Sequence, residues 1–244
     1  MNENNNNTTS TGEMIYFLKE VRARLIKALI VLFVLLIGLL YFANDLYTWL
    51  AYPLLKFLPQ GHLIATQVVS PFFVPFKLAF MAAFLLTVPF FLYQCWAFIT
   101  PALYGHERRM LWPFLLISTL LFYSGMAFAY FVIFPLLFQF LTQVAPVGVQ
   151  LSPDIGEYFD FTIKLLLIFG VLFEIPMIMM LLTKMGVVTR ARFIKMRSYA
   201  IVGAFVVGML FAPPDVVSQT LLAVPIWLLY EIGILLARRD VEIS

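Results

Sequence analysis

An acidic residue, Glu174, stands in the middle of a long apolar stretch. In the segment Phe169–Pro176, all residues except Glu174 are apolar or glycine, which is typical of a membrane helix. Ionising a carboxyl group inside a membrane costs at least about 2.5 kcal/mol, so such an acid normally faces a bundle interior, a wet cavity or a partner. We expect Glu174 to be neutral much of the time, either hydrogen-bonded within the bundle or facing a cavity or partner.

Two further acids, Glu20 and Glu107, each precede an apolar stretch and lie beside basic residues. Glu20 lies four residues before Arg24, and Glu107 directly precedes Arg108 and Arg109. A Glu–Arg pair with i,i+4 spacing stabilises a helix by about 0.3–0.5 kcal/mol, so local pairing explains Glu20 adequately. A second interpretation is that both carboxylates lie at one membrane face and bind a cationic peptide. The spacing leaves both interpretations open.

Residue types that support catalysis or metal binding are scarce. The two histidines, His62 and His106, lie in segments that we place on opposite sides of the membrane, so they cannot share a site. The single cysteine, Cys95, excludes an intramolecular disulfide and a Cys-rich metal site. The sequence contains no Gly-rich phosphate loop. We therefore expect no catalytic residue, metal or cofactor, and the net charge of +3 does not indicate nucleic-acid binding.

The composition indicates a membrane protein. Hydrophobic residues make up 63% of the chain and charged residues 12%, whereas soluble proteins carry about a quarter charged residues. A membrane-spanning helix needs about 20 largely apolar residues, and the sequence predicts an all-α protein with six such helices. Pro213 and Pro214 separate the last two, because adjacent prolines lack the backbone donors of a continuous helix. We place the spans at residues 25–43, 72–95, 111–135, 160–183, 198–212 and 217–236.

The basic residues predict the direction of the spans. Of the 16 Lys and Arg residues, all but three lie in the N-terminal lead-in, the loops before spans three and five, or the C-terminal tail. Membrane proteins concentrate Lys and Arg in their cytoplasmic loops, so these segments and both termini are expected to be cytoplasmic. The other three are Lys56 in the first outer loop and Lys77 and Lys164, which could extend their ammonium groups to the outer interface.

The sequence predicts one membrane domain, residues 13–238, between a disordered polar tail at 1–12 and a short cytoplasmic tail at 239–244. The apolar run of the first span, about 19 residues, exceeds the 7–15 residues of a signal-peptide core, so we expect this span to be retained. The first outer loop, 44–71, is predicted to contain a short helix at the membrane interface, where its aromatic residues prefer to lie.

Prolines within or beside the spans predict bent helices. Each removes an i→i−4 hydrogen bond and tends to bend its helix. The fifth span, at about 22 Å, is also shorter than the roughly 30 Å hydrocarbon core, which predicts thinning of the bilayer or a small tilt beside the last hairpin. We expect a cupped wall open to lipid or partner helices. The prolines are Pro75, Pro89, Pro113, Pro135, Pro176 and Pro225.

Five stretches of the sequence resemble the TatC family, the polytopic receptor subunits of the bacterial twin-arginine protein translocase. Their order and spacing are those of the family, and the resemblance covers most of residues 14–238. The chain departs from the family pattern in its Asn-rich tail, in Phe17, where many members have His, and in Val21, which replaces a common Leu. The stretches are Phe17–Leu25, Ser70–Phe72, Trp96–Arg109, Phe169–Pro176 and Pro213–Gln219.

The resemblance implies a function in protein export. Members bind the twin-arginine signal peptides of folded proteins at the cytoplasmic face of the bacterial inner membrane. They act in a multi-copy receptor complex with the single-span proteins TatB and TatA, and the proton-motive force drives transport. The implied signal-peptide site comprises Glu20, Arg22, Phe98, Pro101, Tyr104 and Glu107. Glu174 matches the intramembrane acid of a partner groove, and positions of functional interest in the outer loop and hairpin match Pro53, Asp215 and Gln219.

A proton-coupled secondary transporter of a small solute is the alternative function. Glu174 would then be the proton site. The sequence shows no convincing internal repeat, no paired intramembrane charges and no matched broken helices, which are typical of such transporters.

Overall fold

The computed structural model describes residues 3–55, 65–66, 69–104, 111–144, 154–212 and 215–237, which are almost entirely helical. Five helical segments in this part of the chain are long and apolar enough to cross a membrane. The predicted all-α, multi-pass fold is thereby confirmed. The helices are α1 Glu3–Leu39, η1 Leu40–Phe42, α2 Ala43–Leu55, α3 Ser70–Tyr104, α4 Leu111–Phe128, η3 Ala129–Ile133, α5 Phe134–Val144, α6 Ile155–Leu172, α7 Ile175–Lys184, α8 Arg190–Lys195, α9 Arg197–Phe211 and α10 Val216–Leu236.

Helix α1 begins at Glu3 and includes most of the segment 1–12, for which the composition predicts disorder. Asn and Thr are weak helix formers, yet adding residues to an existing helix costs less than starting one. Extension from the apolar span accounts for this difference. The fifth expected span, 198–212, corresponds to α9, which has only 15 residues.

Among the described residues, a proline accompanies a helix break at one place and a π-helical segment at another. Pro176 has no N–H to donate to the carbonyl group of Leu172, and α6 ends at Leu172 while α7 begins at Ile175. Pro135 follows η3, a π-helical segment over Ala129–Ile133, where the wider turns accommodate a backbone with a missing donor. By contrast, α3 and α10 continue without a break through Pro89 and Pro225. The bends predicted from sequence are thus found at some prolines only.

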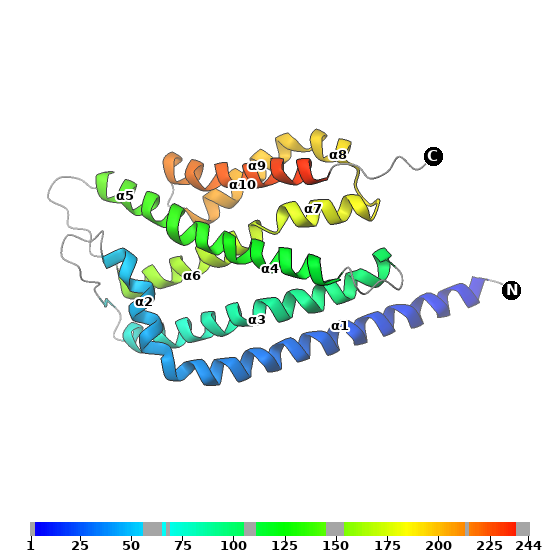
Figure 1. Ribbon diagram of the computed structural model, residues 1–244, viewed down its shortest axis with the longest axis horizontal. Coiled ribbons are helices and arrows are strands. Elements are labelled where there is room, and N and C mark those ends of the chain that lie inside the picture. Colours follow the sequence, from blue (N-terminus) through cyan, green and yellow to red (C-terminus); the bar gives the residue numbers. More distant parts are fainter. Residues whose placement is uncertain are drawn as a thin grey trace.

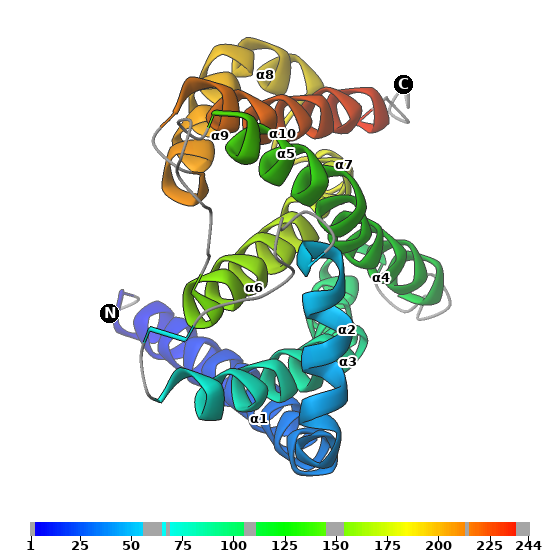
Figure 2. The same cartoon turned by 90° about the vertical axis from the view of Figure 1, so that its left-hand side faces the viewer.

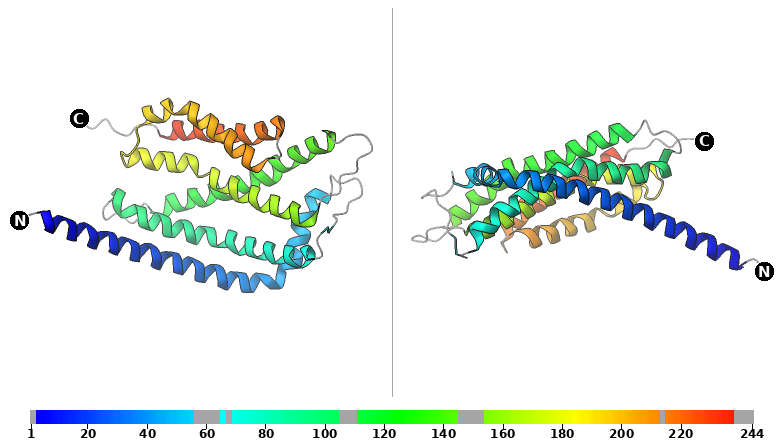
Figure 3. Two further views of the ribbon diagram at one scale, coloured as in Figure 1. Left: turned by 180° about the vertical axis from the view of Figure 1, so that it is seen from behind. Right: turned by 90° about the horizontal axis from the view of Figure 1, so that it is seen from below.

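The helices form an open wall rather than a closed ring. Figure 1 shows that α1 begins and α10 ends at the same end of the molecule, near α8. We call this the basic end, because Arg190, Arg192, Lys195 and Arg197 lie there. Seen from the opposite end, α1 and α3 form one side of the curve, α4 and α6 the middle, and α9 and α10 the other side (Figure 2). The two views in Figure 3 show the same order of helices.

The core lies where α3, α5 and α6 meet. Its fully buried side chains include Val74, Ile133 and Phe159. Helices α4 and α6 approach closely because Gly125 lies against the backbone of Phe169, and a Cβ atom added there would fall under 3 Å from that carbonyl oxygen. On the outer surface, α1 exposes a row of large apolar side chains, as a helix in contact with lipid does. The packed core therefore holds the middle of the wall in place.

Candidate functional site

Glu174 lies at the junction of α6 and α7, in the middle of the membrane-spanning segment Ile155–Lys184. Glu174 lies at the break before Pro176, and its carboxyl group makes no capping hydrogen bond to α7. The residue is only 9% exposed. Burial of a polar side chain in an apolar setting is costly unless the group is hydrogen-bonded, so its neighbours determine what the site can do.

A short polar chain connects Glu174 to α3 through α4. The hydroxyl group of Ser118 on α4, which is fully buried, lies where it can hydrogen-bond to the Glu174 carboxyl group. The indole Nε1 of Trp96 on α3 donates to Ser118 Oγ at 3.1 Å. Glu174 Oε1 itself is buried and accepts no hydrogen bond from the described residues. The arrangement therefore leaves one carboxyl oxygen buried without a donor from the described residues.

Sequence analysis missed Trp96 and Ser118 as neighbours of Glu174. Ser118 is one of the few polar residues within the predicted third span, and that scarcity is the only signal that could have indicated it. Its proximity to Glu174 arises from the packing of α4 against α6, which no local pattern reveals.

Glu20 lies on α1 and pairs with a basic residue of the same helix. Arg24 donates to Glu20 Oε1 from Nε at 3.1 Å and from Nη2 at 2.7 Å. Arg24 Nη1 also reaches the side-chain oxygen of Gln94 on α3 at 3.2 Å. Glu20 Oε2 accepts no hydrogen bond from the part of the chain that the structure describes, and the neighbouring Arg22 is exposed. The local pairing predicted from the i,i+4 spacing is therefore present, and one carboxylate oxygen has no partner among the described residues.

Most other predicted signal-peptide residues are not described at the side-chain level. Phe98, Pro101 and Tyr104 lie in the last turns of α3, one to three turns beyond Gln94, and their side chains are outside the described residues. Glu107 lies outside them altogether. At the other end of the molecule, Pro53 is part of α2, a helix that the sequence predicted for the first outer loop.

Asp215 stabilises the N-terminus of α10, at the end of the molecule opposite the basic end. Asp215 caps α10 by accepting a 2.7 Å hydrogen bond from the backbone N–H of Ser218. This bond lowers the pKa of Asp215. Gln219, one turn further, is half-buried, and its carbonyl oxygen packs against Gly208 of α9. Asp215 and Gln219 thus both shape the α9–α10 hairpin.

Asp154, which sequence analysis did not single out, caps α6 and holds a distant segment beside it. Its Oδ2 accepts hydrogen bonds from the backbone N–H and hydroxyl group of Thr66, at 2.7 and 2.6 Å. Its Oδ1 accepts from the backbone N–H of Gly156 at 2.8 Å. These bonds, those from Thr66 first, lower the pKa of Asp154 to about 2. Asp154 therefore joins the first outer loop to α6.

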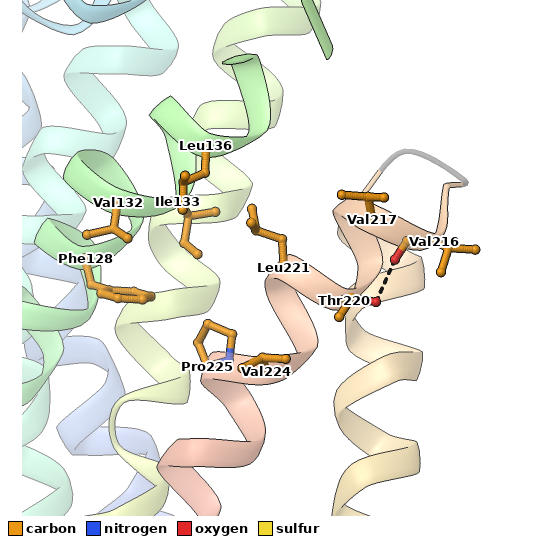
Figure 4. Close-up of a pocket in the computed structure, with 10 residues that line it drawn as sticks. All are labelled: Phe128, Val132, Ile133, Leu136, Val216, Val217, Thr220, Leu221, Val224 and Pro225. Carbon is orange, nitrogen blue, oxygen red and sulfur yellow. Dashed lines mark hydrogen bonds between the residues drawn. The ribbon is translucent and has the colours of Figure 1, made fainter. Parts of the chain in front are cut away.

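An apolar groove opens between the α4–α5 region and α10 (Figure 4). It has a volume of about 490 Å³, and Thr220, its one polar lining residue, donates its hydroxyl hydrogen to the carbonyl oxygen of Val216. Glu174 does not line this groove, because its carboxyl group faces Ser118. The groove residues are Phe128, Val132, Ile133, Leu136, Val216, Val217, Thr220, Leu221, Val224 and Pro225.

Residues 16–225 match the model of the family described as Sec-independent protein translocase protein (TatC). The chain is 54% identical over 229 residues to the Sec-independent protein translocase protein TatC of Escherichia coli (strain K12), which covers 93% of this chain and 89% of the relative. The TatC protein of Aquifex aeolicus (strain VF5) is 41% identical over 224 residues, which are 91% of this chain and 92% of that protein.

Two crystal structures of the twin-arginine translocase receptor TatC share the fold. One superposes with a TM-score of 0.82 at 40% identity and covers 91% of this chain and 97% of that one. The other, in the detergent DDM, has a TM-score of 0.84 at 39% identity and covers 91% and 100%. Since sequence and fold agree over nearly the whole length, the chain belongs to the Sec-independent protein translocase TatC family.

Proposed function

We propose that this protein is the receptor subunit of a twin-arginine translocase in the bacterial inner membrane. It binds twin-arginine signal peptides of folded proteins at the basic end, which faces the cytoplasm together with both termini. TatB-like and TatA-like single-span proteins and further copies of the chain complete the machinery, which the proton-motive force drives. The observation that carries the proposal is the similarity, over 91% of the chain, to the crystal structures of the twin-arginine translocase receptor.

The environment of Glu20 supports binding of a guanidinium group there. Its Oε1 already accepts two bonds from the guanidinium group of Arg24, while Oε2 accepts none from the described residues. A carboxylate with a free oxygen can bind an incoming arginine beside Arg24 or in exchange for it, because guanidinium and carboxylate groups pair in a planar, two-bond geometry. Glu107, further along the chain from Gln94 and α3, is proposed to supply the second carboxylate.

Glu174 and the apolar groove are proposed to receive partner helices. The buried Oε1 of Glu174 accepts no hydrogen bond from the described residues, and a polar side chain on a partner helix is proposed to supply one when that helix packs at the α6–α7 junction. The groove between α4–α5 and α10 offers an almost wholly apolar surface at the same wall of helices. In a bilayer, helices associate through close packing and interhelical hydrogen bonds. The groove is proposed to provide the packing surface, and Glu174 the hydrogen bond.

The alternative, a secondary transporter of a small solute, is less well supported. A polar solute needs convergent polar groups that replace its water, but the groove of about 490 Å³ is lined almost entirely by apolar side chains. The family match is to a protein translocase, which is a transport component of another kind.

Crosslinking of a twin-arginine signal peptide tests the proposal. We expect Glu107→Ala, and more weakly Glu20→Ala, to reduce crosslinking while the protein still inserts in the membrane. Loss of a charge-assisted bond worth about 1.5–3 kcal/mol corresponds to a decrease of about 10- to 150-fold in peptide affinity. Glu231→Ala is the matched control, since this acid lies on α10 and pairs with Arg197. Unchanged crosslinking in the Glu20/Glu107 double variant contradicts the acidic-site assignment.

A further inference from the structure

A second, charged groove lies between α6 and α9, in the half of the molecule opposite the basic end. Its volume is about 300 Å³. Glu157, Asp160 and Lys164 line it from α6, and Leu210 and Phe211 line it from the last turn of α9. The three charged residues follow an i, i+3, i+7 spacing, so they lie along one face of α6. None of them belongs to the signal-peptide or partner-helix sites proposed above.

The charges in this groove are only partly neutralised within the protein. Lys77 on α3 lies 2.6 and 2.9 Å from the two carboxylate oxygens of Asp160, so these two charges compensate each other. Lys164 and Glu157 are both exposed, and the side chains of both lack an ion pair or hydrogen bond within the described ranges. Among the described residues, the groove therefore presents one unpaired cation and one unpaired anion.

Lys164 lies in Ile155–Lys184, a segment long and apolar enough to cross a membrane, so its ammonium group needs a polar environment. An unpaired lysine within a membrane-spanning segment is costly unless it reaches water, a headgroup or a partner. Helix α9 has 15 residues, about 22 Å at 1.5 Å per residue, against a hydrocarbon core of about 30 Å. Its end at Phe211 lines the same groove as Lys164. Thinning of the bilayer beside so short a helix would bring lipid headgroups to the level of Lys164.

The spacing of the free charges matches a ligand that carries both signs. Glu157 and Lys164 are two helical turns apart, about 10.5 Å along the axis. Side chains on a helix tilt toward its N-terminus, so the Lys164 side chain extends toward Glu157 and the membrane surface. A phosphate group beside Lys164 leaves room for an ammonium group beside Glu157. An anionic headgroup would instead leave Glu157 unpaired next to a phosphate.

We propose that this groove binds the headgroup of a zwitterionic phospholipid from the membrane leaflet opposite the basic end. Lys164 binds the phosphate, and Glu157 binds the ammonium group. The Lys77–Asp160 pair closes one side of the site without adding net charge, and Leu210 and Phe211 contact the upper part of the acyl chains.

Native mass spectrometry of the full-length protein in detergent tests this inference. The delipidated protein is titrated with phosphatidylethanolamine or with phosphatidylglycerol, and the fraction of protein that retains lipid is measured. We expect the protein to retain phosphatidylethanolamine better than phosphatidylglycerol. Lys164→Gln should lower retention of phosphatidylethanolamine about tenfold, and Glu157→Gln should remove the preference between the two lipids. Lys195→Gln, at an exposed lysine of α8, is the matched control and should leave retention unchanged.

Three outcomes overturn the inference. The first is that Lys164→Gln and Lys195→Gln retain the lipid equally. The second is that the unaltered protein prefers phosphatidylglycerol. The third is that millimolar inorganic phosphate displaces phosphatidylethanolamine completely, which would make this a site for free phosphate. Because Lys164 and Glu157 are exposed and their side chains unpaired among the described residues, both variants should unfold at the same temperature as the parent protein, and a loss of lipid then reports on the site.

Discussion

At the scale of single residues, the buried carboxyl group of Glu174 has one oxygen that accepts no hydrogen bond from the described residues. Ser118 faces its carboxyl group, and Trp96 in turn donates to Ser118, which fixes the position of the serine hydroxyl. A buried carboxyl oxygen that accepts no hydrogen bond costs about 1–3 kcal/mol, and Oε1 of Glu174 accepts none from the described residues. A donor from a partner helix would recover that cost, which is why Glu174 is proposed to bind a polar group on such a helix.

Substitution of Glu174 separates hydrogen bonding from proton exchange. Gln keeps the size and hydrogen-bonding ability of the side chain but cannot exchange a proton, whereas Ala loses both. We expect Glu174→Gln to retain substantial export of a twin-arginine reporter. Glu174→Ala should weaken crosslinking to TatA- and TatB-like partners about 2- to 12-fold, the equivalent of one hydrogen bond of 0.5–1.5 kcal/mol. If Gln abolishes export as completely as Ala does, proton exchange at Glu174 is the better explanation.

The lowered pKa of Asp154 predicts that the folded protein loses stability in acid. Its pKa is lowered from 3.8 to about 2 in the folded protein, so the ionised form stabilises the fold. This stabilisation is complete above the unfolded pKa and is lost as the pH falls from about 4 through about 2. We expect Asp154→Asn to lower the unfolding temperature in detergent at pH 7 and to reduce the further loss on acidification.

The matched control for Asp154 is Asp45→Asn. Asp45 lies in the first turn of α2 and is exposed, so its substitution should leave the unfolding temperature and its pH dependence unchanged. Equal pH profiles of Asp154→Asn and the parent protein, between pH 2 and pH 5, would contradict the role assigned to the Thr66 hydrogen bonds.

At the scale of helices, proline has an effect that depends on its surroundings. Pro176 ends α6 and Pro135 follows a π-helical segment, yet α10 continues through Pro225. A helix can continue through a proline in a membrane, because neighbouring helices and side chains supply donors to the carbonyl groups that lost theirs. The break at Pro176 is the one that places a polar side chain, Glu174, toward another helix.

The contact of α4 with α6 depends on Gly125. A Cβ atom at this position would lie under 3 Å from the carbonyl oxygen of Phe169 and from the side chain of Phe173. Since the backbone of α6 cannot yield without moving the helix, we expect Gly125→Ala to destabilise the protein by about 1–3 kcal/mol. Thermal unfolding in detergent measures this loss.

Gly38→Ala is the control for helix propensity. No atom lies within 4 Å of a Cβ atom added at Gly38, and alanine favours a helix over glycine by about 0.5–1 kcal/mol. This variant should be neutral or slightly more stable. Similar effects of the Gly38 and Gly125 variants would show that α4 and α6 do not pack as described.

At the scale of the whole molecule, the wall has two distinct ends. The basic residues of α8 and α9 gather where α1 begins and α10 ends, while α2 and the start of α6 lie at the other end (Figure 1). A membrane protein with this distribution is expected to expose the basic end to the cytoplasm. The proposed peptide site and the proposed lipid site then lie on opposite sides of the membrane.

Labelling in intact cells tests this orientation. In a Cys95→Ala background, we expect a membrane-impermeant maleimide to label Thr48→Cys in α2 from the outside. Lys195→Cys in α8 should react only after the cells are broken. Both positions are exposed in the structure. Labelling of Lys195→Cys in intact cells, without labelling of Thr48→Cys, would show that the orientation is reversed.

Local sequence patterns were sufficient to predict where most helices lie and to identify the family. Hydropathy is summed over adjacent residues, so each predicted span overlaps helical segments of the structure. Spans 72–95 and 217–236 lie within the single helices α3 and α10, whereas 160–183 is divided between α6 and α7. Missing backbone donors predicted a bend at Pro176, but equally at Pro89 and Pro225, where the helices continue. The Glu20–Arg24 pair also follows from spacing on one helix. The motif stretches identified the family, which the comparisons confirm.

Only the tertiary structure decided which distant residues meet. Thr66 and Asp154 are 88 residues apart in the chain, and Lys77 and Asp160 are 83 apart. Ser118 comes to face Glu174, and the charged groove forms where the end of α9 lies beside α6. Such contacts depend on how bent helices pack against one another. Hydropathy and motif spacing contain no information about that packing, because each describes one segment of the chain at a time.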